Sequence, residues 1–360
     1  MTKVIDCDGH LIEGAAFAGD LLEKFPDDVK FGEDKNGSWR LMIEDKPFPR
    51  SYGKAPGVDI EHALVDGEDI DPSTVEGMLK DCDREGIDIM VAFPSLGLAC
   101  PGFTSHKLQV DFAHEFNELA GNWSRESKGR IKVVAATPIE DIKGAIKEME
   151  HAKELGLVAM HLPPALQDRN LDNSDLDPFY EAAASMDMAL GVHGAPGVGM
   201  PQIGVDRLDN YIQVHALSFP FDQMYAMNSM ISGGVFERHP KLKVGFMEAG
   251  VGWVPYFIDR LHEHYEKRAD WIPNGWGREP IEYLQRGQIF VSFEAEDITV
   301  PSTIELMGDD WQMYASDYPH WDSDFPNCTR TVQGRKDIPE DSKKKLMNTN
   351  AAKFFGIDGS

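Results

Sequence analysis

Two side chains that could bind a metal ion, Asp8 and His10, lie near the start of the chain and are separated by one residue. They follow the apolar pair Val4-Ile5, which indicates a short β-strand over Val4–His10. Residues two apart on a strand point to the same side, so both side chains should be presented together where the strand ends. A carboxylate oxygen and an imidazole nitrogen at one place suit a divalent transition metal. Asp and His are also common in ordinary turns, so the motif gains weight only from similar strand ends elsewhere.

Four later apolar runs also end in side chains that can bind a metal. These side chains are His161, His193, Glu248 and Asp317. In a β/α barrel the carboxyl ends of all strands meet at one mouth, where catalytic residues collect. A single His at a strand end is more often a structural residue than a ligand, but five such strand ends at one rim favour a metal centre.

The elements that would position these residues alternate along the chain as short apolar runs and helical patterns. The predicted strands are Val4–His10, Ile87–Pro94, Ile131–Pro138, Leu157–Pro163, Ala189–His193, Lys243–Glu248, Gln288–Phe293 and Gln312–Asp317. The predicted helices are Val75–Glu85, Leu108–Lys128, Ile142–Leu155, Pro178–Ser185, Phe221–Gly233, Val254–Lys267 and Pro339–Phe355. Eight strands with intervening helices predict an α/β fold, a (β/α)8 TIM barrel with a parallel sheet that forms a single domain over residues 1–360.

A long insertion, residues 14–74, separates the first strand from its helix and far exceeds a usual βα loop. It contains a hairpin-like piece, Ser38–Ile43 followed by Pro47–Tyr52, and many charges. Because it emerges near the strand ends, we expect it to act as a lid over the barrel mouth or as an oligomer contact. A surface flap without a role in chemistry is the alternative.

The composition limits the classes of function. The formal charge of −26 argues against nucleic acid and anionic membranes as partners, so a small-molecule substrate is expected. The four cysteines lie far apart without a CxxC pair, so neither a cysteine zinc site nor a disulfide framework is indicated. No signal peptide and no apolar run of membrane-spanning length is found, so we expect a cytoplasmic protein.

Three segments of the chain also resemble a known family. They are Ile5–His10, Gly233–Lys243 with the following Gly250–Trp253, and Ser316–Pro319. They resemble the amidohydrolase superfamily, in the branch that includes aminocarboxymuconate-semialdehyde decarboxylase and γ-resorcylate decarboxylase, and the resemblance runs over nearly the whole chain. It implies a metal-dependent enzyme that acts on a small carboxylate-type molecule by hydrolysis or decarboxylation.

The resemblance implies a primary metal set of Asp8, His10, His193 and Asp317. Family members usually carry His-x-His, or a Glu variant, on the first strand, whereas Asp8 takes the first position in this chain. The sixth-strand His that handles the proton of the attacking water in relatives is replaced by Glu248. Glu248 is therefore expected to act either as a ligand or as a general base.

His161 raises the prospect of a second ion. Dinuclear members of the superfamily place a carboxylated Lys on the fourth strand, where this chain has His161. His161 and Glu248 could hold a second ion, and three His with three carboxylates suit zinc, manganese or iron. Alternatively, His161 only forms a hydrogen bond in the pocket.

His320 lies three residues after Asp317 and is a candidate to bind substrate or to orient a ligand. The candidate catalytic residues are therefore Asp317, Glu248 and His320. The alternative is that His320 belongs to an ordinary turn.

The reaction itself stays open between hydrolysis and decarboxylation. A dinuclear non-haem Fe or Fe/Mn oxygenase on the same fold is the first alternative, because Asp8 makes the ligand set richer in carboxylates. A non-catalytic, metal-binding partner subunit is the second, since a fold does not dictate activity.

Relatives of this branch are commonly dimers, so a homodimer or a higher oligomer is expected. Assembly with a homologous subunit is the alternative. Glu294 and Glu296, after the seventh strand, are expected in a solvated loop, and entry into the site is the alternative.

Overall fold

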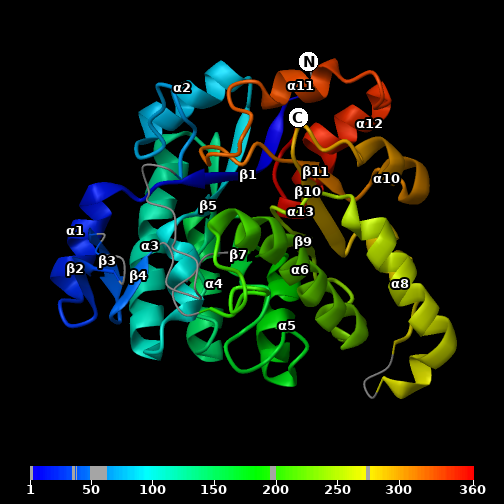
Figure 1. Ribbon diagram of the computed structural model, residues 1–360, viewed down its shortest axis with the longest axis horizontal. Helices are drawn as coiled ribbons and strands as arrows, with labels where there is room; N and C mark the ends of the chain where they lie inside the picture. The colour runs from blue at the N-terminus through cyan, green and yellow to red at the C-terminus, as the bar shows by residue number, and fades with distance from the viewer. Residues whose placement is uncertain (1–2, 35–36, 38, 49–62, 195–199, 273–275) are drawn as a thin grey trace.

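The computed structural model describes the whole chain except residues 1–2, 35–36, 38, 49–62, 195–199 and 273–275 (Figure 1). Eight parallel strands form one sheet in the order β1-β5-β6-β7-β8-β9-β10-β11. Their bounds are β1 Ile5–Leu11, β5 Ile89–Pro94, β6 Ile131–Ala135, β7 Ala159–Leu162, β8 Ala189–Val192, β9 Val244–Phe246, β10 Ile289–Phe293 and β11 Gln312–Tyr314. All eight predicted strands are present, and several end earlier than predicted.

The first strand meets the segment that follows the last one, and this contact closes the barrel. The Asp317 amide donates to the carbonyl of Asp8 (2.9 Å), and the His10 amide donates to the carbonyl of Tyr318 (2.6 Å). The buried carboxylate of Asp6 accepts a hydrogen bond from the Ser316 amide (3.0 Å). These bonds place Asp8, His10 and Asp317 at the same point of the rim.

Helices surround the sheet (Figure 1). The α-helices are α1 Gly14–Lys24, α2 Val75–Glu85, α3 His106–Glu126, α4 Ile142–Leu155, α5 Asp177–Met186, α6 Tyr211–Ser232, α7 Val235–Arg238, α8 Trp253–Arg268, α9 Pro280–Gln285, α10 Val300–Met307, α11 Cys328–Gly334, α12 Glu340–Lys344 and α13 Asn350–Phe355. Short 3-10 helices span Leu96–Gly102, Ser174–Leu176 and Ala269–Trp271, and a π-helical turn spans Lys345–Thr349.

Local capping explains why two of these helices have the predicted bounds. The Thr74 side chain accepts from the amide of Gly77 at the start of α2, and Asp141 does the same for Gly144 at the start of α4. Both helices end at a glycine with φ of 83°, a left-handed conformation that favours Gly. The local sequence therefore determines where α2 and α4 begin and end.

Two other predicted helices differ from the observed ones. The helix predicted over Phe221–Gly233 begins ten residues earlier, at Tyr211, and continues through Pro220. Proline removes one intrahelical hydrogen bond, but the packing of the long helix tolerates this loss. The last predicted helix, over Pro339–Phe355, is divided by the π-helical turn into α12 and α13.

The insertion forms a small sheet of its own beside α1. This sheet is antiparallel, in the order β2 (Val29–Glu33), β3 (Trp39–Ile43) and β4 (Lys46–Phe48). The hairpin of β3 and β4 was predicted, whereas β2 was not, and Pro47–Tyr52 lies partly outside the described residues. The insertion then returns to the barrel rim, where the amide of Trp321 donates to the carbonyl of Ala63 (3.0 Å).

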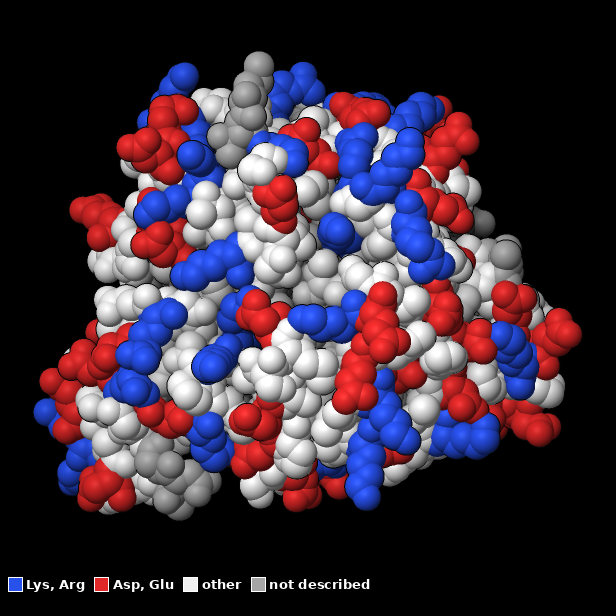
Figure 2. Space-filling model, turned by 180° about the vertical axis from the view of Figure 1, so that it is seen from behind, with Lys and Arg blue, Asp and Glu red and all other residues white. Residues whose placement is uncertain are grey.

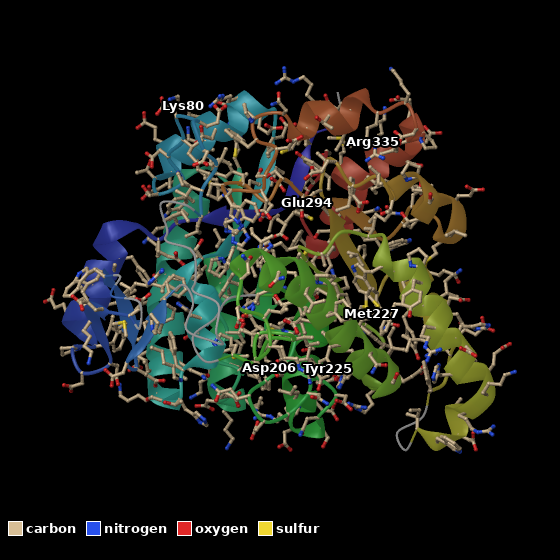
Figure 3. The ribbon with its side chains drawn as sticks, in the orientation of Figure 1. Lys80, Asp206, Tyr225, Met227, Glu294 and Arg335 are labelled. Carbon is tan, nitrogen blue, oxygen red and sulfur yellow. The ribbon has the colours of Figure 1, made fainter. Side chains whose placement is uncertain are left out.

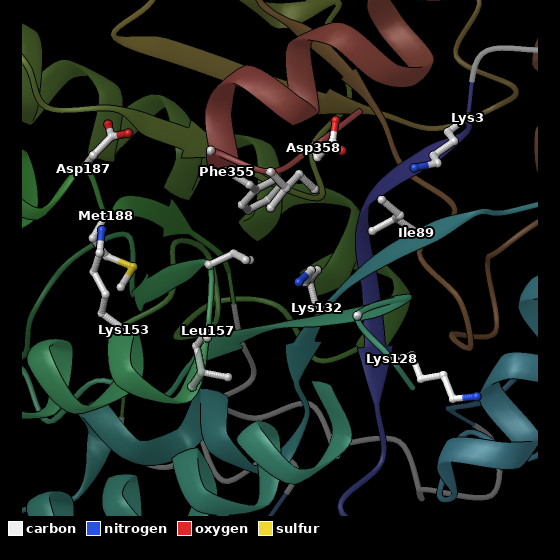
Figure 4. A pocket seen from close by; sticks show the side chains of 15 residues that line it. Lys3, Ile89, Lys128, Lys132, Lys153, Leu157, Asp187, Met188, Phe355 and Asp358 are labelled. Atoms are coloured by element: carbon white, nitrogen blue, oxygen red, sulfur yellow. The ribbon is translucent and has the colours of Figure 1, made fainter. Parts of the chain in front are cut away.

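The opposite end of the barrel holds a pocket of about 490 Å³ (Figure 4). Lys3, Lys132, Lys153 and Phe355 line it, beside the starts of the strands. None of the predicted site residues contributes to it.

Acidic and basic side chains are interspersed on the face seen in Figure 2. No helix among the described residues is long and apolar enough to cross a membrane.

Candidate active site

Asp8, His10 and His193 lie together at the carboxyl end of the barrel. The Oδ1 atom of Asp8 lies 3.8 Å from Nε2 of His10 and 3.6 Å from Nε2 of His193. Each of the three side chains is at most 1% exposed, and together they form a group that could hold a metal ion. The pairing of β1 with β5 shifts register between Asp6 and Gly9, so a bulge precedes His10. Regular strand alternation alone therefore does not explain why Asp8 and His10 converge.

The two histidines present the same ring nitrogen to this point. Nδ1 of His10 lies 3.4 Å from the carbonyl of Pro94, and Nδ1 of His193 lies 2.5 Å from the carbonyl of Gly194. A carbonyl only accepts, so Nδ1 of each ring donates there and Nε2 is the nitrogen left to face the shared point. Such second contacts are what fix the tautomer and orientation of histidine ligands in metal sites.

The donor atoms that converge make no hydrogen bond within the described part of the chain, although Glu248 Oε2 lies 3.0 Å from His193 Nε2. Among the described residues, Asp8 Oδ1, His10 Nε2 and His193 Nε2 are buried without a hydrogen-bond partner. Unpaired buried polar atoms are costly. Ligand atoms that bind one ion at about 2.0–2.2 Å lie roughly 3–3.5 Å apart, close to the spacing seen here. The donor set thus fits a divalent cation.

Asp317 and His320 adjoin this group. Oδ1 of Asp317 lies 3.6 Å from Nε2 of His10 and accepts a hydrogen bond from Nδ1 of His320 (2.8 Å). Burial by itself lowers the pKa of His320, but the charge of Asp317 and this hydrogen bond outweigh burial and raise the pKa to about 9. The ring of His320 also lies against the ring of His10, with the two centroids 4.2 Å apart.

Glu248 reaches the site by a different route from the one predicted. Its Oε2 lies 3.0 Å from Nε2 of His193. However, β9 ends at Phe246, and Val244 and Phe246 pack in the apolar layer shared with the helices. Strand alternation continued from Val244 and Phe246 would therefore direct the Glu248 side chain away from the mouth, although its carboxylate lies there. Glu248 has φ of 56°, so a left-handed turn, and not strand alternation, directs its carboxylate to the mouth.

Left-handed backbone recurs at the other strand-end carboxylate. Asp317 has φ of 53°, so both Glu248 and Asp317 adopt a backbone conformation that normally favours glycine. Such conformations are costly for residues with a Cβ and gather at functional sites, where the surrounding structure holds them. The amide of Glu248 donates to Ser292 Oγ (2.9 Å), which supports its turn.

His161 is buried beside the other site residues. Its Nε2 lies 3.4 Å from the carbonyl of His193, so it donates a proton there. Burial, followed by the charge of His193, lowers the pKa of His161 to about 3, which keeps the ring neutral. Its Nδ1 has no hydrogen-bond partner among the described residues. The two groups of potential ligands around His10 include neither His161 nor Glu248.

Two further residues near the site, Phe93 and Asp6, escaped prediction. The Phe93 ring lies 4.9 Å from the ring of His193 and braces it, and Asp6 ties β1 to the loop after β11. The strand-end position of Phe93 and the Asp6-x-Asp8 repeat are the signals that could have found them. Glu294, labelled in Figure 3, is partly buried, and burial followed by the charge of Asp317 raises its pKa well above the ordinary value.

Comparison with known proteins assigns the family. The amidohydrolase family model matches residues 5–357. The chain belongs to the amidohydrolase family. This confirms the resemblance that the sequence indicated. A 2-amino-3-carboxymuconate-6-semialdehyde decarboxylase of Dictyostelium discoideum is 25% identical over 85% of this chain and 87% of its own length.

Solved structures confirm the TIM-barrel fold of this amidohydrolase. An amidohydrolase from Mycobacterium avium subsp. paratuberculosis K-10 has a TM-score of 0.74 at 21% identity and covers 99% of this chain and 98% of its own. A 5-carboxyvanillate decarboxylase from Novosphingobium aromaticivorans with bound manganese has a TM-score of 0.71 at 18% identity, covering 99% and 97%. These relatives are described as decarboxylases and amidohydrolases, so the oxygenase alternative is not favoured.

Proposed function

We propose that this amidohydrolase is a metal-dependent decarboxylase of a small aromatic or unsaturated carboxylate. One observation carries the proposal: Asp8, His10 and His193 converge with buried donor atoms that have no other partner among the described residues. Decarboxylation is preferred to hydrolysis because the curated relative and the manganese-bound structure are both decarboxylases by description.

The proposed metal ligands are Asp8, His10, His193 and Asp317, around one divalent ion. Manganese is bound in the related 5-carboxyvanillate decarboxylase, and zinc and iron suit the same mixture of nitrogen and oxygen donors. A bound ion would hold the substrate carboxylate with a neighbouring oxygen and polarise them.

His320 is the proposed acid. His320 would deliver a ring proton to the substrate carbon that bears the carboxylate. The proton would come either from Nδ1, which contacts Asp317, or from Nε2. A C–H bond forms there, the C–C bond to the carboxylate breaks, and its electron pair returns to the substrate as carbon dioxide leaves. Solvent then returns one proton to His320, so each turnover consumes one proton.

Glu248 and His161 complete the proposed machinery. Glu248 lies 3.0 Å from His193 and is placed to take or return a proton as a general base, or to bind a metal ion directly. A second ion between His161 and Glu248 stays a prediction, and the number of ions per chain tests it. We also propose that the insertion, residues 14–74, covers the mouth, since Val65 donates to the carbonyl of Pro319 next to His320 (2.9 Å).

The setting of the enzyme is part of the proposal. All four cysteines are free and buried, which suits the reducing cytoplasm. We propose a homodimer or a higher oligomer, and a homologous subunit is the variant to check. A non-catalytic partner subunit is the less favoured reading, because the converging side chains retain their ligand chemistry.

The test is carbon dioxide release by the manganese-loaded and the metal-stripped protein. Suitable substrates are 2,6-dihydroxybenzoate, 5-carboxyvanillate and 2-amino-3-carboxymuconate semialdehyde, with lactones and esters alongside to detect hydrolysis. His193→Ala should abolish turnover and lower bound manganese, while His262→Ala, on the outer helix α8, should change neither. Hydrolysis of a lactone without carbon dioxide release, or full activity of His193→Ala, would overturn the proposal.

A further inference from the structure

A second group of potential ligands lies on the outer surface of the barrel, between α3 and α4. These helices lie side by side in Figure 1. His114 and Glu118 are four residues apart on α3, and Glu148 and His151 are three apart on α4. Both spacings place side chains on one face of a helix. The packing of the two helices brings the two faces together.

The contacts within this group cross from one helix to the other. Nδ1 of His114 lies 3.0 Å from Oε1 of Glu148, and Nε2 of His151 lies 3.0 Å from Oε1 of Glu118. The two imidazole rings stack with centroids 4.8 Å apart. Ligand atoms of His114, Glu118 and His151 all lie within 4.8 Å of one another, which makes them a group that could hold one ion.

Two details indicate that the group is prepared for a ligand. Nε2 of His151 is buried and makes no hydrogen bond to any described residue, although Glu118 is close. Glu148 is largely buried, and its second oxygen accepts from Nδ2 of Asn117 (3.1 Å), which fixes the carboxylate. Metal sites commonly contain a carboxylate that is oriented by a second hydrogen bond and a histidine nitrogen that makes no hydrogen bond of its own.

The local charge also suits a cation. Histidine binds a metal as the neutral ring, so two carboxylates and two such ligands would carry a charge of about −2, which one divalent ion neutralises. Lys24 lines the shallow hollow of about 300 Å³ beside His114, but its amine is paired with Glu115. The solvent-facing side chains of His114 and Glu118 leave an ion free access from water.

We propose that His114, Glu118, Glu148 and His151 form a second divalent-metal site, of the zinc class, that links α3 to α4 outside the catalytic centre. Two imidazole nitrogens with carboxylate oxygens are ligands that zinc accepts in tetrahedral geometry. The site shares no residue with the barrel mouth and does not depend on the proposed reaction. Its effect is to join two helices, so a bound ion should raise the stability of the protein.

The test counts zinc per chain after equilibration of the chelator-stripped protein with a small excess of zinc. His151→Ala and Glu118→Gln should each bind one ion fewer than wild type. His262→Ala is the matched control, since His262 and Glu266 also form a His–Glu pair (3.7 Å) but on α8 alone. Zinc should raise the unfolding temperature of wild type by roughly 2–5 °C more than that of Glu118→Gln.

The outcomes separate this site from the catalytic one. The difference of one ion is expected whether or not the barrel mouth binds zinc, and it should persist in a His193→Ala background. Cobalt in place of zinc should give a visible spectrum that His151→Ala loses. Equal metal content in wild type, His151→Ala and Glu118→Gln would overturn the proposal, as would an equal loss in His262→Ala. If His151→Ala fails to fold, Glu118→Gln decides, because it replaces a half-exposed side chain by one of equal size.

Discussion

Glu13 should make the stability of this protein fall as pH rises. It follows β1, and its Oε1 accepts hydrogen bonds from the amides of Ser95 (3.1 Å) and Gly97 (2.9 Å), which hold the turn after β5. Its side chain is 9% exposed. Burial raises the pKa of Glu13 from 4.5 to about 7, although these hydrogen bonds act in the opposite direction.

The magnitude follows from the difference in pKa between the folded and unfolded chains. A difference of about 2.5 units at 1.36 kcal/mol per unit corresponds to about 3.4 kcal/mol. Because the folded protein holds the proton more tightly, this contribution is fully present below pH 4.5 and is lost as pH rises through about 7. Between pH 5 and pH 8 the loss is about 2.5 kcal/mol.

Glu13→Gln removes this titration and keeps an acceptor for the two amides. The free energy of unfolding of Glu13→Gln, relative to wild type, should therefore increase by about 2.5 kcal/mol from pH 5 to pH 8. Urea unfolding at both pH values, at equal metal loading, measures it. Glu305→Gln, at an exposed position of α10, is the control and should show no such change. A difference between Glu13→Gln and wild type that varies by less than about 0.5 kcal/mol would refute the reasoning.

Three further predictions concern the site and the assembly. If the site holds two ions, Glu248→Gln should lower the metal content towards one ion per chain. If it holds one ion, Glu248→Gln should lower turnover by about 10²–10⁴. Unchanged metal content together with unchanged turnover would show that Glu248 has no role in the metal chemistry. Gly191→Ala places a Cβ 2.7 Å from the Phe93 ring, which braces His193, so it should weaken metal binding about tenfold and cost about 1–3 kcal/mol of stability. Metal titration and urea unfolding check this, and wild-type affinity would contradict it. Light scattering should give a mass above the 40.2 kDa of one chain, and a monomer at micromolar concentration would count against the predicted assembly.

The barrel could be read from the sequence because parallel strands buried on both faces appear as continuous apolar runs. The helices Val75–Glu85 and Ile142–Leu155 were predicted with their observed bounds, since their caps are local. The start of α6 was missed because Pro220 signals a break in any local pattern. Only packing along the whole helix makes that proline tolerable.

The chemistry of the site was also visible in the order of residue types. The strand-end residues could be named together because the ends of parallel strands in a barrel share one rim, and the family resemblance singled out Asp8, His10, His193 and Asp317 as the expected metal set. Which nitrogen of each histidine faces the centre was not visible, since the carbonyls of Pro94 and Gly194 decide it. These carbonyls are placed by the backbone of the rim and not by any sequence spacing.

The direction of Glu248 and the pairing of α3 with α4 belong to the tertiary structure alone. A left-handed turn at Glu248 replaces strand alternation, and its conformational cost is met by contacts with other strands, such as Ser292. His114 and His151 each look like ordinary surface residues of separate helices. They become possible ligands of one ion only because the two helices pack with those faces in contact.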